Sequence, residues 1–341
     1  MRLHLLLNIL GFVATFVATT FVSLNSATAR DAGAQVFDHV YVVVLENHDF
    51  DAALYSGASP FLLSLSRAQG LATHYSGVTH PSLPNYIAMI AGDEFDVRDD
   101  APSCFASDLR SGQSCHRFVG DSLVDQLETA GLDWALYAET LPTTGALAQA
   151  FPDNGPKALY AQKHNPFAYF EQIATNPARL KKLKPLESLA DDLSGKTPNF
   201  AFVVPNQCHD GHGLATCNDP VSLTRDFDAF VERTVGMIRS SPNWTRNSAI
   251  VITFDEGEKQ AYAKSATAPA NAGGVAAAKG EEDDNRVATV VITKCGGPAA
   301  NDAPLNHYAL LATVEDGFKL PRLRKAKEAP TLMDLFDRPC Q

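Results

Sequence analysis

Five short apolar segments recur along the chain and are separated by longer polar or amphipathic stretches. Each segment is rich in β-branched or aromatic residues and almost continuously apolar, a pattern typical of strands buried on both faces of a sheet. The predicted strands cover residues 39–47, 133–139, 199–206, 248–257 and 287–294.

Helical periodicity occupies several of the intervening stretches. Residues 120–131 predict a helix that is capped by Asp121 and closed at Gly131, and residues 306–318 predict another. Alternating strands and helices predict an α/β fold, a three-layer sandwich with a mostly parallel central sheet and helices on both faces. In residues 225–240 the apolar side chains form one helical face: Phe227, Phe230, Val231, Val235 and Ile238.

Residues 258–286 interrupt this alternation. The segment is rich in alanine, glycine and charged residues and has no apolar face, which predicts a long mobile surface loop inserted between two core strands. The sequence shows no internal repeat and no second domain. It therefore predicts one domain over residues 36–341, with this flexible insertion.

The N-terminus has the pattern of an export signal over residues 1–29. Arg2 precedes an apolar run from Leu5 to Val22, and residues 27–29 form a small-residue cleavage site. The apolar run is longer than in most signal peptides, so an uncleaved membrane anchor is the alternative interpretation. Cleavage predicts a secreted or periplasmic protein without a membrane span.

Cysteine usage agrees with an oxidising compartment. The close spacing of the first four cysteines favours two local disulfides, Cys104–Cys115 and Cys208–Cys217, which leaves Cys295–Cys340 as the third pair. Spacing alone does not fix this connectivity. A structural zinc site is the weaker interpretation, because no C-x-x-C pair is present.

The chain of 341 residues carries a formal net charge of −11 at neutral pH. This charge argues against a nucleic-acid-binding protein, which would present a basic face. An acidic protein that handles an anionic substrate needs local positive charge, and a bound metal ion is the obvious source. The oligomeric state is not predictable from these features.

Polar side chains follow three of the predicted strands. Ligands of an open parallel sheet bind beyond the carboxyl ends of its strands, so these side chains are expected to converge. A carboxylate after a single strand is usually an ordinary turn or cap residue. Together they predict a divalent cation site, because crowded carboxylates repel one another unless a cation neutralises them. The residues are Glu46, Asn47, Asp210, His212, Asp255 and Glu256.

The stretch "HPSLPNYIAMIAG", residues 80–92, places a serine between two prolines before an apolar run. Pro84 suits the first turn of a helix, which puts Ser82 and Asn85 at the N-terminal end. Backbone N–H groups and the helix dipole favour an anion there. Ser82 is then either a simple N-cap or a nucleophile that attacks phosphorus beside a metal ion.

Several separated motifs together resemble the bacterial and fungal phosphoesterase family, which includes phospholipase C-type enzymes and secreted acid phosphatases. The resemblance extends from Val36 to Phe318 and implies a fold similar to the alkaline phosphatase superfamily. The serine-type "HPSLPNY" is more similar to the acid phosphatase branch. The motifs, in family order, are "VVLENHDFD", "GVTHPSLPNYIAMIAG", "VPNQCHDGHG", "SPNWTRNSAIVITFDEGE" and "NHYALLATVEDGF".

The resemblance implies roles for individual residues. Ser82 stands at the nucleophile position, and Asn85 matches a phosphate-contacting asparagine. His307 matches a late histidine that either completes a second metal position or acts as general acid. The leaving group then takes its proton from His307, His212 or metal-bound water. His209 replaces an asparagine that is common in the family, so it is a candidate substrate contact, an extra ligand or a neutral exchange. The implied metal ligands are Glu46, Asn47, Asp255, Glu256, Asp210, His212 and His307.

The resulting hypothesis is a metal-dependent hydrolase that cleaves small phosphate monoesters through a phosphoserine intermediate on Ser82. Oxygen ligands favour Ca²⁺, Mg²⁺ or Mn²⁺, and a second site with histidines would accept Zn²⁺ or Fe. A phospholipase C-type phosphodiesterase acting on phospholipid is the closest alternative. A sulfatase is less compatible, because "HPSLPNY" lacks the C/S-x-P-x-R context. A non-catalytic surface protein that metal merely stabilises is the alternative from another class.

Overall fold

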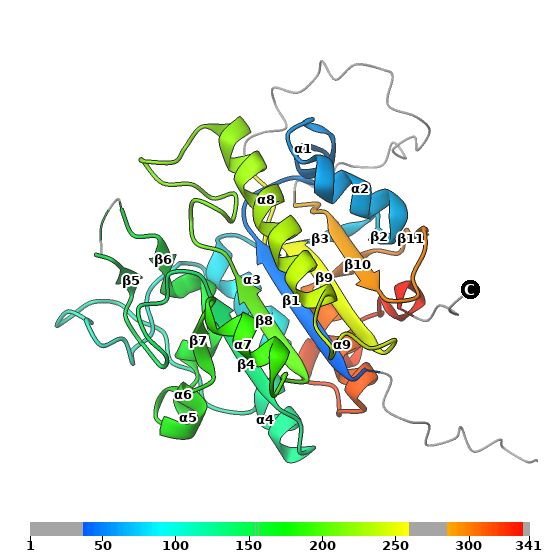
Figure 1. Cartoon of the computed structure of the whole chain (residues 1–341). Helices are drawn as coiled ribbons and strands as arrows, with labels where there is room; N and C mark the ends of the chain where they lie inside the picture. The colour runs from blue at the N-terminus through cyan, green and yellow to red at the C-terminus, as the bar shows by residue number, and fades with distance from the viewer. Residues whose placement is uncertain (1–36, 154, 156, 259–284, 337–341) are drawn as a thin grey trace, which may run out of the picture. The chain divides into compact units, whose positions relative to one another are not determined.

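A central sheet of eight strands organises the chain, of which the computed structural model describes residues 37–153, 155, 157–258 and 285–336. The strand order across the sheet is β11-β2-β10-β9-β1-β8-β4-β7 (Figure 1). In that order the strands are Ala299–Asn301, Gly70–Ala72, Thr289–Thr293, Ser248–Phe254, His39–Leu45, Phe200–Val204, Trp134–Ala138 and Leu183–Pro185.

The sheet is mostly parallel, which confirms the predicted fold class. β1 pairs parallel with β9 and with β8, and β8, β4 and β7 continue in the same sense. β10 runs antiparallel to β9 and β2. All residues of β9 and six of the seven in β1 are buried, as expected for strands covered on both faces. All five predicted strands are present.

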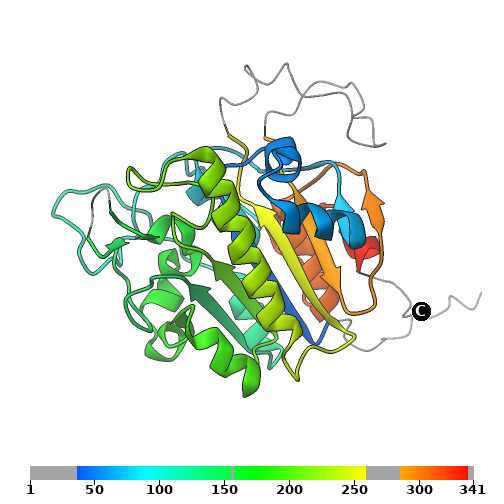
Figure 2. The same ribbon diagram turned by 45° about the horizontal axis from the view of Figure 1, so that its top comes forward.

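Helices cover both faces of the sheet. α8 (Pro220–Arg239) packs with α2 (Pro60–Ala68), and α3 (Ser82–Ala91) packs with α9 (His307–Phe318). Figures 1 and 2 show α8 in front of the strands and α9 behind them. Every residue of α3 is buried, so its first residue, Ser82, has a fixed position beside the sheet.

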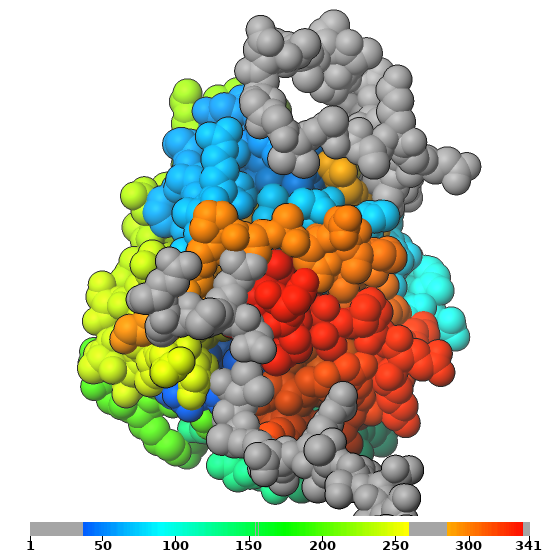
Figure 3. Space-filling view, turned by 90° about the vertical axis from the view of Figure 1, so that its right-hand side faces the viewer, coloured from blue at the N-terminus to red at the C-terminus, as the bar shows by residue number. Residues whose placement is uncertain are grey.

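Shorter elements complete the described part of the chain. Strand β3 (Tyr75–Ser76) pairs with β12 (Leu305–Asn306), and β5 (Ala150–Phe151) pairs with β6 (Tyr160–Ala161). The edge strand β11 contacts the 3-10 turn η5 (Met333–Leu335), seen in Figure 3 as orange beside red. The other helices and 3-10 turns are α1 (Phe50–Tyr55), α4 (Leu123–Thr129), α5 (Glu171–Ala174), α6 (Pro177–Leu180), α7 (Ser188–Ser194), η1 (Gln162–His164), η2 (Pro166–Tyr169) and η4 (Arg324–Lys327).

The predicted cap of α4 was wrong by one residue. Ser122, rather than Asp121, is the N-cap, because its side chain and that of Asp125 form a reciprocal capping box. Asp125 Oδ2 accepts hydrogen bonds from both the main-chain N and the Oγ of Ser122. The helix still closes at Gly131, which has the positive φ of 74° typical of a helix-ending glycine.

Two of the three predicted disulfides, Cys104–Cys115 and Cys208–Cys217, are confirmed. The third pair, Cys295–Cys340, cannot be compared, because Cys340 lies outside the described residues. The predicted signal peptide and most of the insertion at 258–286 also lie outside them. Among the helices that the structure describes, none combines the length and apolar character needed to cross a membrane.

Candidate active site

Three buried carboxylates meet at the carboxyl edge of the sheet. Glu46 follows β1, Asp255 follows β9, and Asp210 lies in the loop after β8, so parallel pairing brings them together. The main-chain N of Glu46 donates to the carbonyl oxygen of Asp210 at 2.8 Å. The main-chain N of Asn47 donates to Asp255 Oδ1 at 3.2 Å. All three carboxylates have 0% exposure.

This crowding has an electrostatic cost. Burial, followed by the negative charge of Glu46, raises the pKa of both Asp210 and Asp255 well above the ordinary carboxyl value. Three of the carboxylate oxygens have no hydrogen-bond partner: Glu46 Oε1, Asp210 Oδ2 and Asp255 Oδ2. In the described residues, no group of three or more His, Cys, Asp or Glu side chains is arranged to hold a metal ion.

Glu256 extends the acidic cluster toward α3. Its Oε2 accepts a hydrogen bond from Asn85 Nδ2 at 3.3 Å and lies 2.8 Å from His80 Nδ1. Burial raises the pKa of Glu256, while the hydrogen bond with His80 opposes this shift. Sequence reasoning does not identify His80 as a site residue, although it stands two positions before Ser82.

Ser82 is the first residue of α3 and contacts this cluster directly. Its hydroxyl donates to Glu46 Oε2 at 3.0 Å and accepts a hydrogen bond from Lys163 Nζ at 3.2 Å. The interpretation of Ser82 as a simple N-cap is wrong, because Pro81 holds that position and no side-chain capping bond is present. The next main-chain N–H, that of Leu83, donates to Asp100 Oδ1 at 3.0 Å.

Asn85 lies in the site, but its side chain makes most of its hydrogen bonds with the loop that precedes α3. Its Oδ1 accepts hydrogen bonds from the main-chain N atoms of Val78 and Thr79 at 2.8 and 3.1 Å. Its Nδ2 donates to the carbonyl oxygens of Thr79 and Pro81 at 2.7 and 3.2 Å. Asn85 therefore shapes the loop that presents Ser82, and its contact with phosphate stays a prediction.

Sequence reasoning also missed two residues of η1, Lys163 beside Ser82 and His164 beside the carboxylates. Lys163 and His164 belong to η1, which follows the two-residue strand β6 rather than a core strand. Lys163 Nζ donates to Asp100 Oδ2 at 3.2 Å and to His212 Nε2 at 3.4 Å, as well as to Ser82. Burial alone would lower the pKa of Lys163, but the surrounding carboxylates raise it above its ordinary value, so its ammonium group stays charged.

His164 lies between two of the buried carboxylates. Its Nε2 is 3.1 Å from Glu46 Oε1, and its Nδ1 is 3.5 Å from Asp210 Oδ2. The ring stacks on Tyr86 of α3, with centroids 5.3 Å apart. Burial and the charge of Lys163 lower the pKa of His164 well below its ordinary value. The imidazole is therefore uncharged. It packs against the carboxylate cluster but does not offset the negative charge there.

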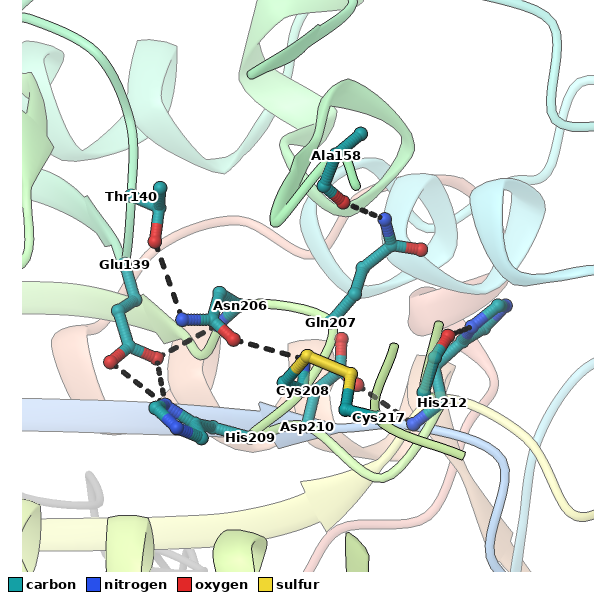
Figure 4. The surroundings of a disulfide bond; sticks show 11 residues. Glu139, Thr140, Ala158, Asn206, Gln207, Cys208, His209, Asp210, His212 and Cys217 are labelled. Atoms are coloured by element: carbon teal, nitrogen blue, oxygen red, sulfur yellow. Dashed lines mark hydrogen bonds and ion pairs between the residues drawn. A yellow bond between two sulfur atoms is a disulfide. The ribbon is translucent and has the colours of Figure 1, made fainter. Parts of the chain in front are cut away.

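The loop after β8 sends its two histidines in different directions (Figure 4). His212 is held at the site: its main-chain N donates to Asp210 Oδ1 at 2.7 Å, and its Nδ1 donates to the carbonyl oxygen of Gly213. His209 instead pairs with Glu139, 2.9 Å from each carboxylate oxygen. The structure therefore does not place His209 beside Ser82, where a substrate contact was expected.

Gly211 makes this turn possible. It has a φ of 105°, and a Cβ atom there would lie 2.7 Å from the carbonyl oxygen of Glu46. Only glycine combines that backbone conformation with so close an approach. The glycine between Asp210 and His212 thus allows the loop to lie against the end of β1.

His307 lies behind the acidic cluster, at the start of α9. Its Nδ1 accepts a hydrogen bond from the hydroxyl of Tyr75 at 3.0 Å, and its Nε2 donates to the carbonyl oxygen of Asp255. Burial lowers its pKa to about 4, against the opposing effect of the bond to Asp255. Both ring nitrogens are engaged, so in this arrangement His307 supports the main chain at Asp255. Its roles as metal ligand and proton donor stay predictions.

The model of the phosphoesterase family matches residues 54–321, and the chain belongs to this family. A probable acid phosphatase of Kluyveromyces lactis is 30% identical over 298 residues, covering 86% of this chain and 61% of the relative. The chain thus spans about three fifths of the length of that relative.

A phosphatidylinositol-3-phosphatase of Mycobacterium tuberculosis is 25% identical over 338 residues and matches at nearly full length, 98% of this chain and 95% of the relative. Among solved structures, a phosphonate monoester hydrolase of Agrobacterium radiobacter superposes with a TM-score of 0.52 at 12% identity, over 88% of this chain and 77% of that one. A sulfatase of Pseudoalteromonas sp. gives the same TM-score. These two likenesses concern the fold alone.

Proposed function

We propose that this protein is an acid phosphatase-like enzyme that hydrolyses phosphate monoesters with Ser82 as the nucleophile. One observation carries the proposal: the hydroxyl of Ser82 is hydrogen-bonded both to a buried carboxylate, Glu46, and to a cation, Lys163. A serine activated by an adjacent acceptor and a neighbouring positive charge suits attack on an anionic ester. The family membership supports the same chemistry.

The reaction proceeds in two displacements. Glu46 Oε2 already accepts the hydroxyl hydrogen of Ser82, and it takes this proton as the bond from Oγ to phosphorus forms. The ester bond from phosphorus to oxygen breaks, and the departing alcohol receives a proton from Nε2 of His212 in its doubly protonated form. In that form Nδ1 keeps its bond to Gly213, and Nε2 no longer accepts from Lys163. Water then attacks the phosphoserine and gives a proton to His212, the bond from phosphorus to Oγ breaks, and the proton held by Glu46 returns to Ser82 as phosphate leaves.

We further propose that a divalent cation binds at the acidic cluster. The donor set fits such an ion, because three carboxylate oxygens are buried there without hydrogen-bond partners. Glu46, Asn47, Asp255 and Glu256 would hold it, with Asp210 at the adjoining strand end. When bound, the ion would neutralise phosphate oxygens and favour ionisation of the nearby hydroxyl. Oxygen ligands suit Ca²⁺, Mg²⁺ or Mn²⁺.

Secretion or periplasmic residence is part of the proposal. Two disulfides within the described residues support an oxidising compartment. The mycobacterial relative is named for a lipid phosphate monoester, so a phosphorylated lipid headgroup is a second substrate candidate.

A substrate panel tests this function. The purified chain is assayed on p-nitrophenyl phosphate, bis-p-nitrophenyl phosphate, phosphatidylinositol 3-phosphate and phosphatidylcholine, each with and without a chelator. We expect monoester hydrolysis that the chelator abolishes and added divalent cation restores. Preferred cleavage of the diester or of phosphatidylcholine would support the phospholipase C-type alternative. A metal-dependent rise in melting temperature without any cleavage would identify a non-catalytic binding protein.

A further inference from the structure

Lys163 is the cationic side chain that contacts Ser82 in the described part of the chain. Its three N–H donors match three acceptors: Ser82 Oγ, Asp100 Oδ2 and His212 Nε2. The side chain is 15% exposed, against 1% for the residue Ser82. Of the two hydrogen-bond partners of the Ser82 hydroxyl, Lys163 is therefore the partly exposed one, whereas Glu46 is fully buried.

Asp100 fixes the position of this cation relative to the nucleophile. One of its oxygens accepts from Lys163 Nζ, and the other accepts from the main-chain N of Leu83, the residue that follows Ser82. A single carboxylate thus ties Lys163 to the first turn of α3. Asp100 is a positioning residue in this arrangement, because it acts through Lys163.

The substrate classes that a phosphoesterase distinguishes differ in charge. Near pH 7.5 a phosphate monoester is mostly a dianion, because its second pKa is about 6, whereas a diester carries one negative charge. During attack, phosphorus bonds directly to Ser82 Oγ. The phosphoryl oxygens then come within reach of a donor that is already hydrogen-bonded to that Oγ.

We propose that Lys163, held by Asp100, binds the additional anionic oxygen of phosphate monoesters and thereby makes the site selective for monoesters over diesters. The inference rests on the proposed function and adds its specificity determinant. On substrate binding, Lys163 exchanges its bonds to Ser82 and His212 for bonds to phosphate oxygens and keeps its bond to Asp100. A diester has a second alcohol group in place of that anionic oxygen and gains less from the cation.

The competing explanation is structural: Lys163 would only offset the charge of the buried carboxylates. In that case its loss would lower stability and would affect both substrate classes equally. Activity on one substrate cannot separate the two explanations. The ratio of activities on two esters with the same leaving group can separate them.

The experiment compares wild type, K163M, K163R and D100N on p-nitrophenyl phosphate and bis-p-nitrophenyl phosphate at pH 7.5. For K163M we expect kcat/KM on the monoester to fall roughly 10- to 100-fold, the range for a lost hydrogen bond to a charged group. The diester value should change by less than about threefold on the same scale. K163R should restore part of the selectivity, and D100N should lower it in the same direction.

Inhibition by inorganic phosphate gives a binding measurement that needs no diester turnover. Its inhibition constant should weaken in K163M by about the same factor as the monoester kcat/KM. The matched control is K184M, because Lys184 is also a partly buried lysine paired with a carboxylate, Asp192, but lies on β7. K184M should leave unchanged both the ratio of monoester to diester kcat/KM and the inhibition constant for phosphate.

Equal losses on both esters with unchanged phosphate inhibition in K163M would overturn the inference. If K163M does not fold, D100N decides, and an unchanged ratio in D100N overturns it. Failure of the proposed function has a different signature, because the wild-type protein itself would then cleave no phosphate monoester.

Discussion

Glu46 has two different neighbours at its two carboxylate oxygens. Oε2 accepts the hydroxyl hydrogen of Ser82, and Oε1 faces the neutral ring of His164 without a hydrogen bond. A buried carboxylate with one unsatisfied oxygen is costly and persists where function requires it. The position of this one side chain therefore links the buried acidic cluster to Ser82, the proposed nucleophile.

Glu315 is also a buried acid, but it lies on α9, outside the proposed site. It has 0% exposure, and its Oε1 accepts a hydrogen bond from the main-chain N of Leu323 at 2.8 Å. Burial raises its pKa from 4.5 to about 8. The folded state thus keeps a proton that the unfolded chain releases, so this group lowers stability as the pH rises from about 4.5 to about 8.

We predict that E315Q removes this pH dependence. The variant should match wild type below pH 4.5 and be more stable by a few kcal/mol near pH 8, because each pKa unit corresponds to about 1.4 kcal/mol. Urea unfolding at several pH values measures the difference. E328Q is the control, since Glu328 is exposed. Parallel stability curves for E315Q and wild type would contradict the prediction.

At the scale of elements, the loop between β8 and α8 carries Asp210 and His212, and the Cys208–Cys217 disulfide closes it (Figure 4). The loop also contacts β1 through the hydrogen bond from Glu46 N to the carbonyl oxygen of Asp210. The disulfide therefore restrains the segment that holds one wall of the site.

We predict that the double variant C208S/C217S loses both stability and activity. Opening a loop of this size should cost about 2–3 kcal/mol of unfolding free energy. Activity should fall further, because Asp210 and His212 lose their fixed positions. The control is C104S/C115S, whose cysteines are 11 residues apart against 9. Similar kcat/KM values for the two folded variants would argue against a role of the loop restraint in catalysis.

Element-level patterns explain which parts of the site the sequence could predict. Glu46 and Asp255 follow long buried strands, and parallel strands end at a common edge, so their proximity follows from the apolar pattern. Lys163 follows a two-residue strand, and it meets Ser82 across 81 positions of the chain. No local periodicity signals that contact. Likewise, the divergence of His209 and His212 depends on the backbone turn at Gly211.

For the whole molecule, the chain's net charge of −11 is unfavourable for an anionic substrate. The described part of the site opposes this charge with one cation beside Ser82, the ammonium group of Lys163. The fold alone does not define the activity, because a phosphonate monoester hydrolase and a sulfatase share it at 12% identity. The serine and its partners therefore have to be tested directly.

The most direct test is to trap the covalent intermediate. The protein is mixed with a radiolabelled phosphate monoester and quenched in acid within one turnover, and the labelled peptide is identified by mass spectrometry. We expect one phosphoryl group on Ser82. We also expect S82A to show no label and no turnover while keeping the wild-type melting temperature. Full turnover by S82A, or label on a different residue, would contradict the proposed mechanism.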